Sequence, residues 1–208
     1  AVNGASISVP HVIPHTNFIP LSNHGVFNIH GLFEMDGILV VVAQSKIIRV
    51  NASTLAVDKN HVELFTPSPG GVKKIDRLLY IANYDDVFVY FAHHNAIKSI
   101  LSKKIRELWR ELSNDDKAAC AMGYDARYGF FVVSVGSRAF YYKIPGDFAS
   151  DLATDASPGG HWGEYISSYS FVEFMTGING QCVGITSTGI MIELFANTPD
   201  TANALQYD

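Results

Sequence analysis

Short apolar runs recur along the chain from Val26 onward, and each run is bounded by Gly, Asn, Asp or Ser. Runs of this length that are rich in β-branched and aromatic residues are typical of β-strands. They predict strands at residues 26–33, 38–43, 47–51, 62–66, 78–82, 87–92, 129–135, 138–144, 162–166, 171–176, 181–186 and 190–195. We therefore expect a mainly β protein.

Several of these strands are joined by only two or three turn-forming residues. The linkers are 35–37, 84–86, 136–137 and 187–189. Links this short join antiparallel neighbours, because a parallel pair needs a crossover of roughly a dozen residues or more. The pattern predicts antiparallel hairpins and excludes a doubly wound parallel sheet.

One segment has a helical period instead. Apolar residues at 101, 105, 108, 109 and 112 lie at spacings of three and four, which places them on one helical face. Residues 113–116 (SNDD) then match a capping pattern and predict a second short helix through Cys120. We expect a helical hairpin inserted at about 98–121, with Trp109 docked on the sheet.

The strands repeat in groups. Residues 69–71 and 158–160 both read Pro-Gly-Gly, and each triplet closes a group of strands. Repeats of roughly 40 residues with four strands each are typical of propeller blades. The sequence predicts four-stranded antiparallel units at 26–66, 72–100, 120–166 and 170–195, arranged as a small or incomplete β-propeller.

Residues 1–25 form a segment of a different kind, rich in Pro, Asn and His. Its prolines disfavour a helix, because proline fixes the backbone and lacks an amide donor. We expect an extended N-terminal arm at 1–25, followed by one propeller-like domain at 26–208. The N-terminus has no signal-peptide pattern, and no apolar run reaches the roughly 18 residues of a membrane helix, so no membrane span is expected.

Charge is scarce and unevenly distributed. Charged residues make up 17% of the chain, against about 25% in a typical soluble domain, and the formal net charge is −5. Ten of the charged residues lie between positions 98 and 117, so the strands are poorer in charge than the average. We expect other subunits to cover the sheet edges and the arm, and the helical hairpin to face solvent or a different partner.

Possible metal ligands occur in three groups. They are His11 with His15, His93 with His94, and Asp147 with Asp151 and Asp155. The first pair has helical spacing in a proline-rich segment, and the second would point to opposite faces of a strand, which favours a loop pair after Phe91. The aspartates are interpreted as a solvated linker. We expect no metal and no cofactor.

Catalytic groups are equally sparse. Residues 184–189 have the wrong spacing for a nucleophile elbow, and Cys120 and Cys182 are expected to be reduced, buried thiols. A carboxylate pair for glycoside hydrolysis could be drawn from Asp85, Asp125, Glu164 and Glu173. The sequence gives no geometry by which to select a pair among these carboxylates. We expect no enzymatic activity and name no catalytic residue.

Aromatic residues crowd the second half of the chain. They include Tyr124, Tyr128, Phe130, Phe131, Phe140, Tyr141, Tyr142, Trp162, Tyr165, Tyr169, Phe171 and Phe174. Their alternating placement favours packing within sheets, with some left over for interfaces.

One stretch resembles a known family. The segments that carry the resemblance are 100–109 (ILSKKIRELW), 112–121 (LSNDDKAACA), 123–132 (GYDARYGFFV), 37–42 (GILVVV) with 46–51 (KIIRVN), and 184–194 (GITSTGIMIEL). Together with the strand at 138–144 and Trp162, they resemble the β-propeller nozzle, or packaged-DNA stabilisation, proteins of short-tailed phages. The resemblance covers roughly residues 26–195.

This resemblance implies a structural protein of the virion tail, made in the host cytoplasm. Such a protein would assemble as a homo-oligomeric ring below the portal and adaptor, contact other tail or portal-adaptor proteins and help to retain packaged DNA. It would also form part of the conduit through which double-stranded DNA passes without sequence-specific binding. Two alternatives remain open at this point: a carbohydrate-binding β-rich module or glycosidase, and a propeller-type protein-binding scaffold.

Overall fold

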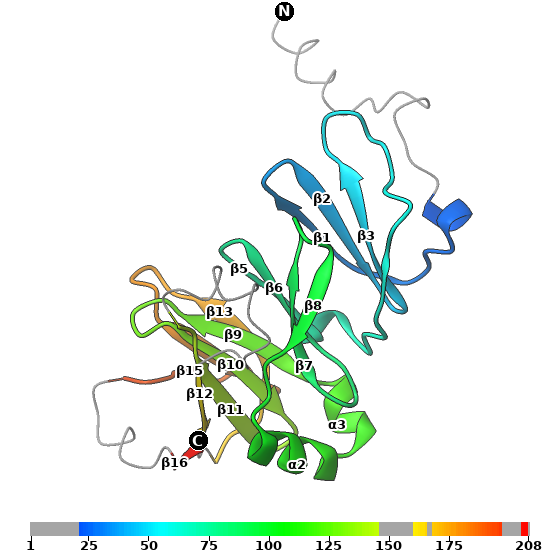
Figure 1. Cartoon of the computed structure of the whole chain (residues 1–208). Helices are drawn as coiled ribbons and strands as arrows, with labels where there is room; N and C mark the ends of the chain where they lie inside the picture. Colours follow the sequence, from blue (N-terminus) through cyan, green and yellow to red (C-terminus); the bar gives the residue numbers. More distant parts are fainter. Residues whose placement is uncertain (1–20, 146–159, 166–167, 197–204, 208) are drawn as a thin grey trace, which may run out of the picture.

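The computed structural model describes residues 21–145, 160–165, 168–196 and the backbone of 205–207. Figure 1 shows a mainly β protein whose strands form four small antiparallel sheets in a four-blade propeller arrangement. The described residues also contain two α-helices, α2 (Lys103–Glu111) and α3 (Asn114–Ala118). The predicted fold class is confirmed.

Each blade is built from strands that are consecutive in the chain, with one addition in blade 3. Blade 1 contains β1 (Ile29–Met35), β2 (Ile38–Ala43), β3 (Lys46–Asn51) and β4 (Val62–Glu63). Blade 2 contains β5 (Val72–Ile75), β6 (Leu78–Ala82), β7 (Val87–Phe91) and β8 (Ala96–Ser99). Blade 3 contains β9 (Ala121–Asp125), β10 (Phe130–Val135), β11 (Arg138–Lys143), β12 (His161–Tyr165) and, outside β12, β16 (Leu205–Tyr207). Blade 4 contains β13 (Phe171–Thr176), β14 (Cys182–Thr186) and β15 (Met191–Glu193).

Tight turns hold the strands in register, as the β1–β2 hairpin illustrates. Met35 pairs with Ile38, and the two residues between them, Asp36 and Gly37, have φ angles of 52° and 79°. A two-residue turn with both φ angles positive matches the right-handed twist of the flanking strands, and Asp-Gly is among the pairs that adopt it most easily. Local sequence therefore fixes the pairing of these strands.

Three apolar clusters hold the blades side by side. One cluster lies between blades 1 and 2, a second between blades 2 and 3, and a third between blades 3 and 4. The first strands of successive blades, β1, β5, β9 and β13, contact one another in that order, so they lie on the inner side of the arrangement. In the described part of the chain, no apolar cluster joins blade 4 back to blade 1, and the four blades form an open arc.

The helical hairpin connects blade 2 to blade 3. Ser102 and Ser113 cap the two helices through their side-chain oxygens, and α2 buries Ile105 and Trp109 in the cluster between these blades. The indole N–H of Trp109 donates to the carbonyl of Asn83 at 3.2 Å, which confirms that this tryptophan docks on the sheets.

The observed elements differ from the predicted ones in places. The helical insertion was expected at about 98–121 and lies between β8, which ends at Ser99, and β9, which begins at Ala121. The strands β5, β8, β9 and β16 were not predicted. Residues 1–20 of the predicted arm lie outside the described residues, and its end forms a 3-10 helix, η2 (Leu21–His24), which contains no proline.

Candidate interaction surface

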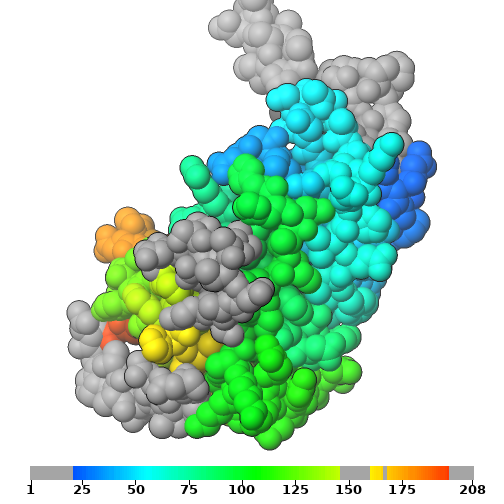
Figure 2. Space-filling view, viewed as in Figure 1, coloured from blue at the N-terminus to red at the C-terminus, as the bar shows by residue number. Residues whose placement is uncertain are grey.

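Large apolar side chains are exposed on the first and last blades and on the segments that flank them. Those of blade 1 and its flanking segments are Phe27, Ile29, Leu32, Leu55 and Phe65, and those of blade 4 are Tyr169, Val172, Met175, Ile178, Ile190 and Met191. Among the described residues, blades 2 and 3 and the helices expose none of this size. Figure 2 shows the hairpin of blade 4, in orange, and the beginning of the described chain, in blue, on opposite sides of the visible face. Exposed apolar groups that gather in this way mark interaction sites.

Blade 4 has one covered face and one open face. Phe171 and Phe174 point into the cluster with blade 3, whereas Val172 and Met175 of the same strand are 53% and 45% exposed. Cross-strand pairing places Val183 opposite Met175. Val172, Met175 and Met191 define what we call the blade 4 end.

Carboxylates accompany these apolar groups. In the same sheet Glu173 pairs with Ile185, which pairs with Met191, and residues directly opposite each other share a face of a sheet. Glu173 therefore belongs to the open face of blade 4, and residues 168–196 contain no Lys or Arg. The blade 4 end is apolar with a negative margin.

Blade 1 has the corresponding asymmetry. Phe33 and Met35 of β1 pack toward blade 2, whereas Ile29 and Leu32 pair with Ala43 and Val41 on the other face and are 47% and 57% exposed. The outer part of that face is covered, because its cluster includes Leu21, Val26 and Val57. The open part lies along β1, the inner strand. Phe27, Ile29 and Leu32 define the blade 1 end.

A buried carboxylate and the arginine that pairs with it join blade 3 to blade 4. The fully buried Asp125 carboxylate accepts hydrogen bonds from the Arg127 guanidinium at 2.7 Å and from the backbone N–H of Cys182 at 3.0 Å. Burial opposes ionisation of Asp125, but the hydrogen bonds from Arg127 and Cys182 outweigh it, so the pKa of Asp125 lies below its ordinary value. Arg127 also reaches Glu193 of blade 4 at 2.6 Å, so it bridges two carboxylates across the junction.

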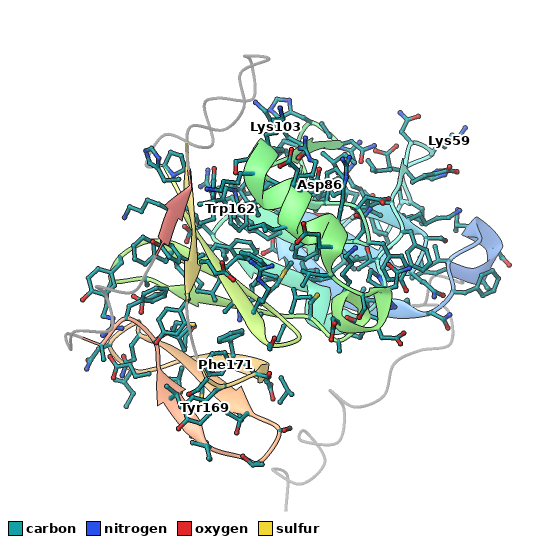
Figure 3. All side chains as sticks on the ribbon, turned by 90° about the horizontal axis from the view of Figure 1, so that it is seen from below. Lys59, Asp86, Lys103, Trp162, Tyr169 and Phe171 are labelled. Carbon is teal, nitrogen blue, oxygen red and sulfur yellow. The ribbon has the colours of Figure 1, made fainter. Side chains whose placement is uncertain are left out.

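A second buried carboxylate, Asp86, fixes α2 against blade 2. It accepts a hydrogen bond from Arg106 at 3.0 Å and from Ser99 at 2.9 Å. Figure 3 shows Asp86 beside the helix. Asp86 and Asp125 therefore hold structural junctions and are not free for chemistry.

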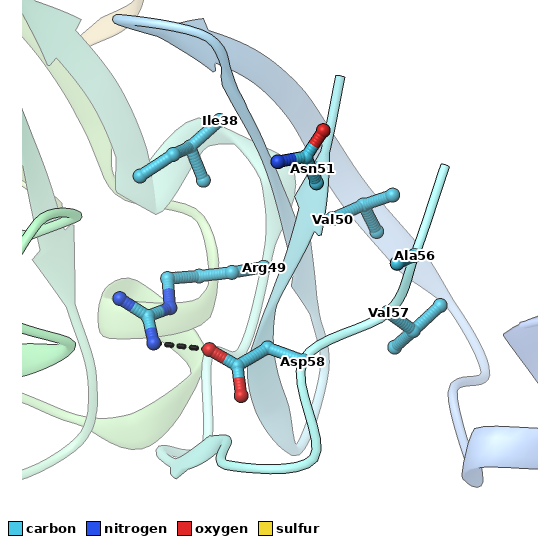
Figure 4. Close-up of a pocket in the computed structure, with 7 residues that line it drawn as sticks. All are labelled: Ile38, Arg49, Val50, Asn51, Ala56, Val57 and Asp58. Atoms are coloured by element: carbon cyan, nitrogen blue, oxygen red, sulfur yellow. Dashed lines mark hydrogen bonds and ion pairs between the residues drawn. The ribbon is translucent and has the colours of Figure 1, made fainter. Parts of the chain in front are cut away.

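A shallow pocket lies on blade 1. Its volume is about 320 Å³, and it is lined by Ile38, Arg49, Val50, Asn51, Ala56, Val57 and Asp58 (Figure 4). The guanidinium of Arg49 pairs with Asp58 and donates to the carbonyl of Ala92 at 2.9 Å. Its charge is already neutralised, and these contacts tie blade 1 to blade 2.

The four candidate catalytic carboxylates have different surroundings. Asp125 pairs with Arg127, whereas Glu164 on β12 pairs with Arg138 at 2.7 Å. Asp85 lies in an exposed turn, and Glu173 lies on the open face of blade 4. Asp125 and Glu164 thus interact with separate arginines, each within a structural contact.

Most of the aromatic residues pack within and between the sheets. Buried members of the set are Phe131, Phe140, Tyr141, Tyr142, Trp162, Phe171 and Phe174. The indole N–H of Trp162 donates to the carbonyl of Ile100 at 2.6 Å in the core between blades 2 and 3. The interpretation as sheet packing is confirmed for these residues, while Tyr169 is exposed beside blade 4.

The residues that were considered as possible metal ligands lie in a turn or outside the described residues. His93 and His94 lie in the turn between β7 and β8, as expected, and His93 contacts Asp36 at 3.2 Å. His11, His15, Asp147, Asp151 and Asp155 lie outside the described residues. Over the ranges that the structure describes, no group of three His, Cys, Asp or Glu side chains could hold a metal ion.

Cys120 and Cys182 are both free and buried, which confirms that prediction. Burial raises the pKa of each thiol to about 12. None of the described helices is long and apolar enough to cross a bilayer.

In comparisons with known proteins, the chain matches solved structures but no family model and no curated sequence. The extracellular domain of a protein assigned to a one-component system of B. thetaiotaomicron is similar with a TM-score of 0.49 and 10% identity, over 89% of this chain and 24% of that one. A second structure of the extracellular domain of the same protein, there described as a hybrid two-component system, is similar with a TM-score of 0.47 and 11% identity, over 90% of this chain and 24% of that one. A computationally designed protein is similar with a TM-score of 0.44 and 13% identity, over 78% of this chain and 44% of that one. The chain therefore spans less than half the length of each of these proteins.

Proposed function

We propose that this protein is a structural component of a phage tail, a nozzle subunit that assembles with further copies into a ring below the portal and adaptor. The observation that carries the proposal is the placement of the exposed large apolar side chains, which among the described residues belong to blades 1 and 4 and their flanks. A subunit with apolar ends on both sides suits a ring, since each end can be covered by a neighbour. The assignment to a tail comes from the sequence resemblance.

The interior of the blades fits a mechanical role. The apolar clusters and the ion pairs of Asp86 and Asp125 join every pair of consecutive blades or brace a blade against its helix. Close packing of this kind makes a stiff body, because protein interiors are dense and hardly compressible. A stiff ring can hold a channel open while DNA passes and resist the pressure of the packaged genome.

The charge fits a conduit. With a net charge of −5, the chain offers no general attraction to phosphates, and non-specific DNA binding depends on basic side chains. DNA that leaves through such a ring would slide without being retained. We expect purified protein to bind duplex DNA weakly, if at all, at physiological salt, and strong retention on a DNA column would count against this role.

The direct test locates the protein in virus particles. Antibody labelling of purified virions is expected at the tail tip, and particles assembled without the protein are expected to lose packaged DNA on mild heating, measured as nuclease-sensitive DNA. Particles that lack the protein but retain their DNA and infect normally would overturn the proposal. Absence of the protein from purified virions would do the same.

A further inference from the structure

We propose that the N-terminal arm of one copy adds an outer strand to blade 4 of a neighbouring copy, with residues 5–9 of the arm paired to β15. The contact rests on the ring of the proposed function, because the arm must find a neighbour beside blade 1. It requires no particular number of copies in the ring. It also leaves the apolar faces of the blade 1 end and the blade 4 end free for the neighbours, because it occupies a strand edge.

The edge that receives the arm belongs to the last blade. Blades 1 and 2 have four strands each, and in blade 3 the fourth strand, β12, is itself followed by β16. Blade 4 has three strands in the part of the chain that the structure describes, and there β15 pairs with β14 on one side only. An unpaired edge of this kind is a template for a further strand.

The backbone of β15 is oriented for such an addition. The N–H of Leu194, just after this strand, donates to the carbonyl of Cys182 on β14 at 2.8 Å. Successive residues in an antiparallel sheet bond toward alternate sides, so the N–H and C=O groups of Met191 and Glu193 point away from β14. Over the described ranges, no backbone group pairs with them.

The chain already completes one blade by adding a distant segment. In blade 3, β16 comes from beyond blade 4 in the sequence and pairs antiparallel with β12, with Tyr207 opposite Trp162. The outer edge of a blade in this fold therefore accommodates a strand that is not its neighbour in sequence. The arm would make the same kind of contact between two copies.

The sequence of the arm contains a segment suited to this edge. Residues 5–9 read ASISV, in which small and β-branched residues alternate, and Pro10 then ends the run. Paired as a strand, the segment would direct Ile7 and Val9 to one face and Ser6 and Ser8 to the other. Residues 1–20 contain no Lys, Arg, Asp or Glu, so the segment can lie along β15 without burying a charged side chain.

The described end of the arm lies where it can reach a neighbour. Leu21 of η2 packs on the outer part of the blade 1 face that points away from blade 2, and β15 is the outermost described strand of blade 4. In the ring these two places belong to adjacent copies, whereas within one chain they lie on opposite sides, with η2 in blue and β15 at the left in Figure 1. The eleven residues 10–20 span roughly 36–40 Å when extended, more than twice the width of a four-stranded blade.

Cysteine cross-linking of the full chain tests the contact. Ser8→Cys places a thiol in the arm, and Met191→Cys places one on β15, while the native Cys120 and Cys182 are buried and do not compete. A short bismaleimide joins cysteines of paired strands in either register, because opposite Cβ atoms lie about 4.5–5.5 Å apart and diagonal ones about 7–8 Å. A mixture of the two variants should give a covalent pair of twice the 22.8 kDa chain mass on a denaturing gel, and neither variant alone should do so. Absence of the pair from the mixture at micromolar concentrations would overturn the proposal.

A double variant with both cysteines shows which chain receives the arm. Exchange between copies predicts cross-linked species at multiples of the chain mass. Cross-linking within single chains, detected by peptide mass spectrometry at the mass of one chain, would assign the arm to its own blade 4 and overturn the exchange.

A charge in the arm tests whether residues 5–9 form the added strand. Ile7→Asp in the Ser8→Cys chain should lower the yield of the cross-link to Met191→Cys at least about tenfold, because its carboxylate would be buried in the strand contact. Asn3→Asp makes the same change in net charge outside the alternating segment and should leave the yield unaltered. Circular dichroism should show that all variants are folded. Equal yields from the two variants would contradict the pairing of residues 5–9.

Strand exchange and the tail role give separate results. A ring that forms in purified protein without a link between positions 8 and 191 would overturn the exchange and leave the tail role standing. A cross-linked ring that is absent from virions would support the exchange and remove the tail role.

Discussion

The buried carboxylate of Asp125 on blade 3 accepts a hydrogen bond from the backbone N–H of Cys182 on blade 4, at 3.0 Å. The bond joins the end of β9 to the start of β14, so it spans the junction between the two blades. Arg127 neutralises the same carboxylate from the following turn. One side chain therefore ends a strand, orders a turn and fastens the next blade.

Replacement of Asp125 by alanine should destabilise the protein strongly. The change leaves the buried Cys182 N–H without a partner, which costs about 1–3 kcal/mol, and it removes one of the two carboxylates that pair with Arg127. Urea unfolding followed by tryptophan fluorescence measures the loss. Glu107→Ala, on the exposed face of α2, should stay within about 0.5 kcal/mol of the wild type.

The same carboxylate predicts a dependence on acid. The folded pKa of Asp125 lies below the ordinary value of 3.8, so its stabilising effect is present above pH 3.8 and is lost as the pH falls through the folded pKa. The difference in unfolding free energy between the wild type and Asp125→Ala should therefore shrink below pH 3.8. A difference that stays constant down to pH 2 would show that the charge of Asp125 does not contribute.

Gly123 is expected to tolerate no side chain. A Cβ atom at this position would lie 2.7 Å from Sγ of Cys182 and 2.7 Å from Cγ of Phe174, which is closer than van der Waals contact allows. Gly123→Ala should push β13 and β14 away from β9 and cost about 1–3 kcal/mol. In a double-mutant cycle with Cys182→Ala, the two changes should be less than additive, because the smaller residue makes room for the new methyl group. Additive losses would place the strain elsewhere.

His30 should weaken the fold in mild acid. Burial lowers the pKa of His30 below 6.5 and outweighs a backbone hydrogen bond with Ser68 that acts in the opposite direction. Because the unfolded chain takes up a proton on this histidine more readily than the folded protein, a fall in pH favours unfolding. The contribution of His30 to the free energy of unfolding is therefore largest above pH 6.5 and declines as the pH falls toward the folded pKa. His30→Asn should flatten the change in unfolding free energy between pH 6.5 and 5. If the variant shows the same change in unfolding free energy between pH 6.5 and 5 as the wild type, other histidines cause that change.

The two thiols should react only after unfolding. Cys120 and Cys182 are buried, and their raised pKa of about 12 keeps them protonated at pH 8. A thiol reagent such as Ellman's reagent should label neither in native protein and both in guanidinium chloride. Rapid labelling of one thiol under native conditions would reveal local opening at its blade junction.

The sequence predicted those parts of the fold that depend on local chemistry. The strands β2, β6 and β13 match their predicted bounds, because turn residues flank apolar runs in each case. The strands that were missed have weaker local signals. Two lysines interrupt β5, and β9 contains Ala121 and Gly123, small residues that fit because Phe174 and Cys182 pack against them. A strand that tertiary contacts stabilise in this way has no β pattern of its own.

The blade ends could be predicted only in part. Alternation along β13 would place Phe171 on the face of Met175 and Phe174 on the face of Val172, whereas a register shift between Phe171 and Glu173 allows both phenylalanines to point toward blade 3. The sequence pattern also does not tell which of the two faces has a neighbour. The low charge of the strands indicated that other subunits cover part of the sheets, but it did not show which blades carry the covered surface. The contacts among the blades had to be known before the open faces could be recognised. Likewise, Asp125 was identified as a carboxylate of interest, but its role became clear only from Arg127 and Cys182.

The position of β16 has a consequence for the time at which the blades are completed. Blades 1, 2 and 4 consist of strands that follow one another in the chain, so each can form soon after its last strand is synthesised. Blade 3 differs, because β16 pairs with the outer edge of β12 although all of blade 4 lies between them in the sequence. During translation, the edge of β12 therefore stays open until blade 4 has been made. An open strand edge is a site for non-native pairing, so the ribosome or a chaperone would need to shield blade 3 longer than its neighbours.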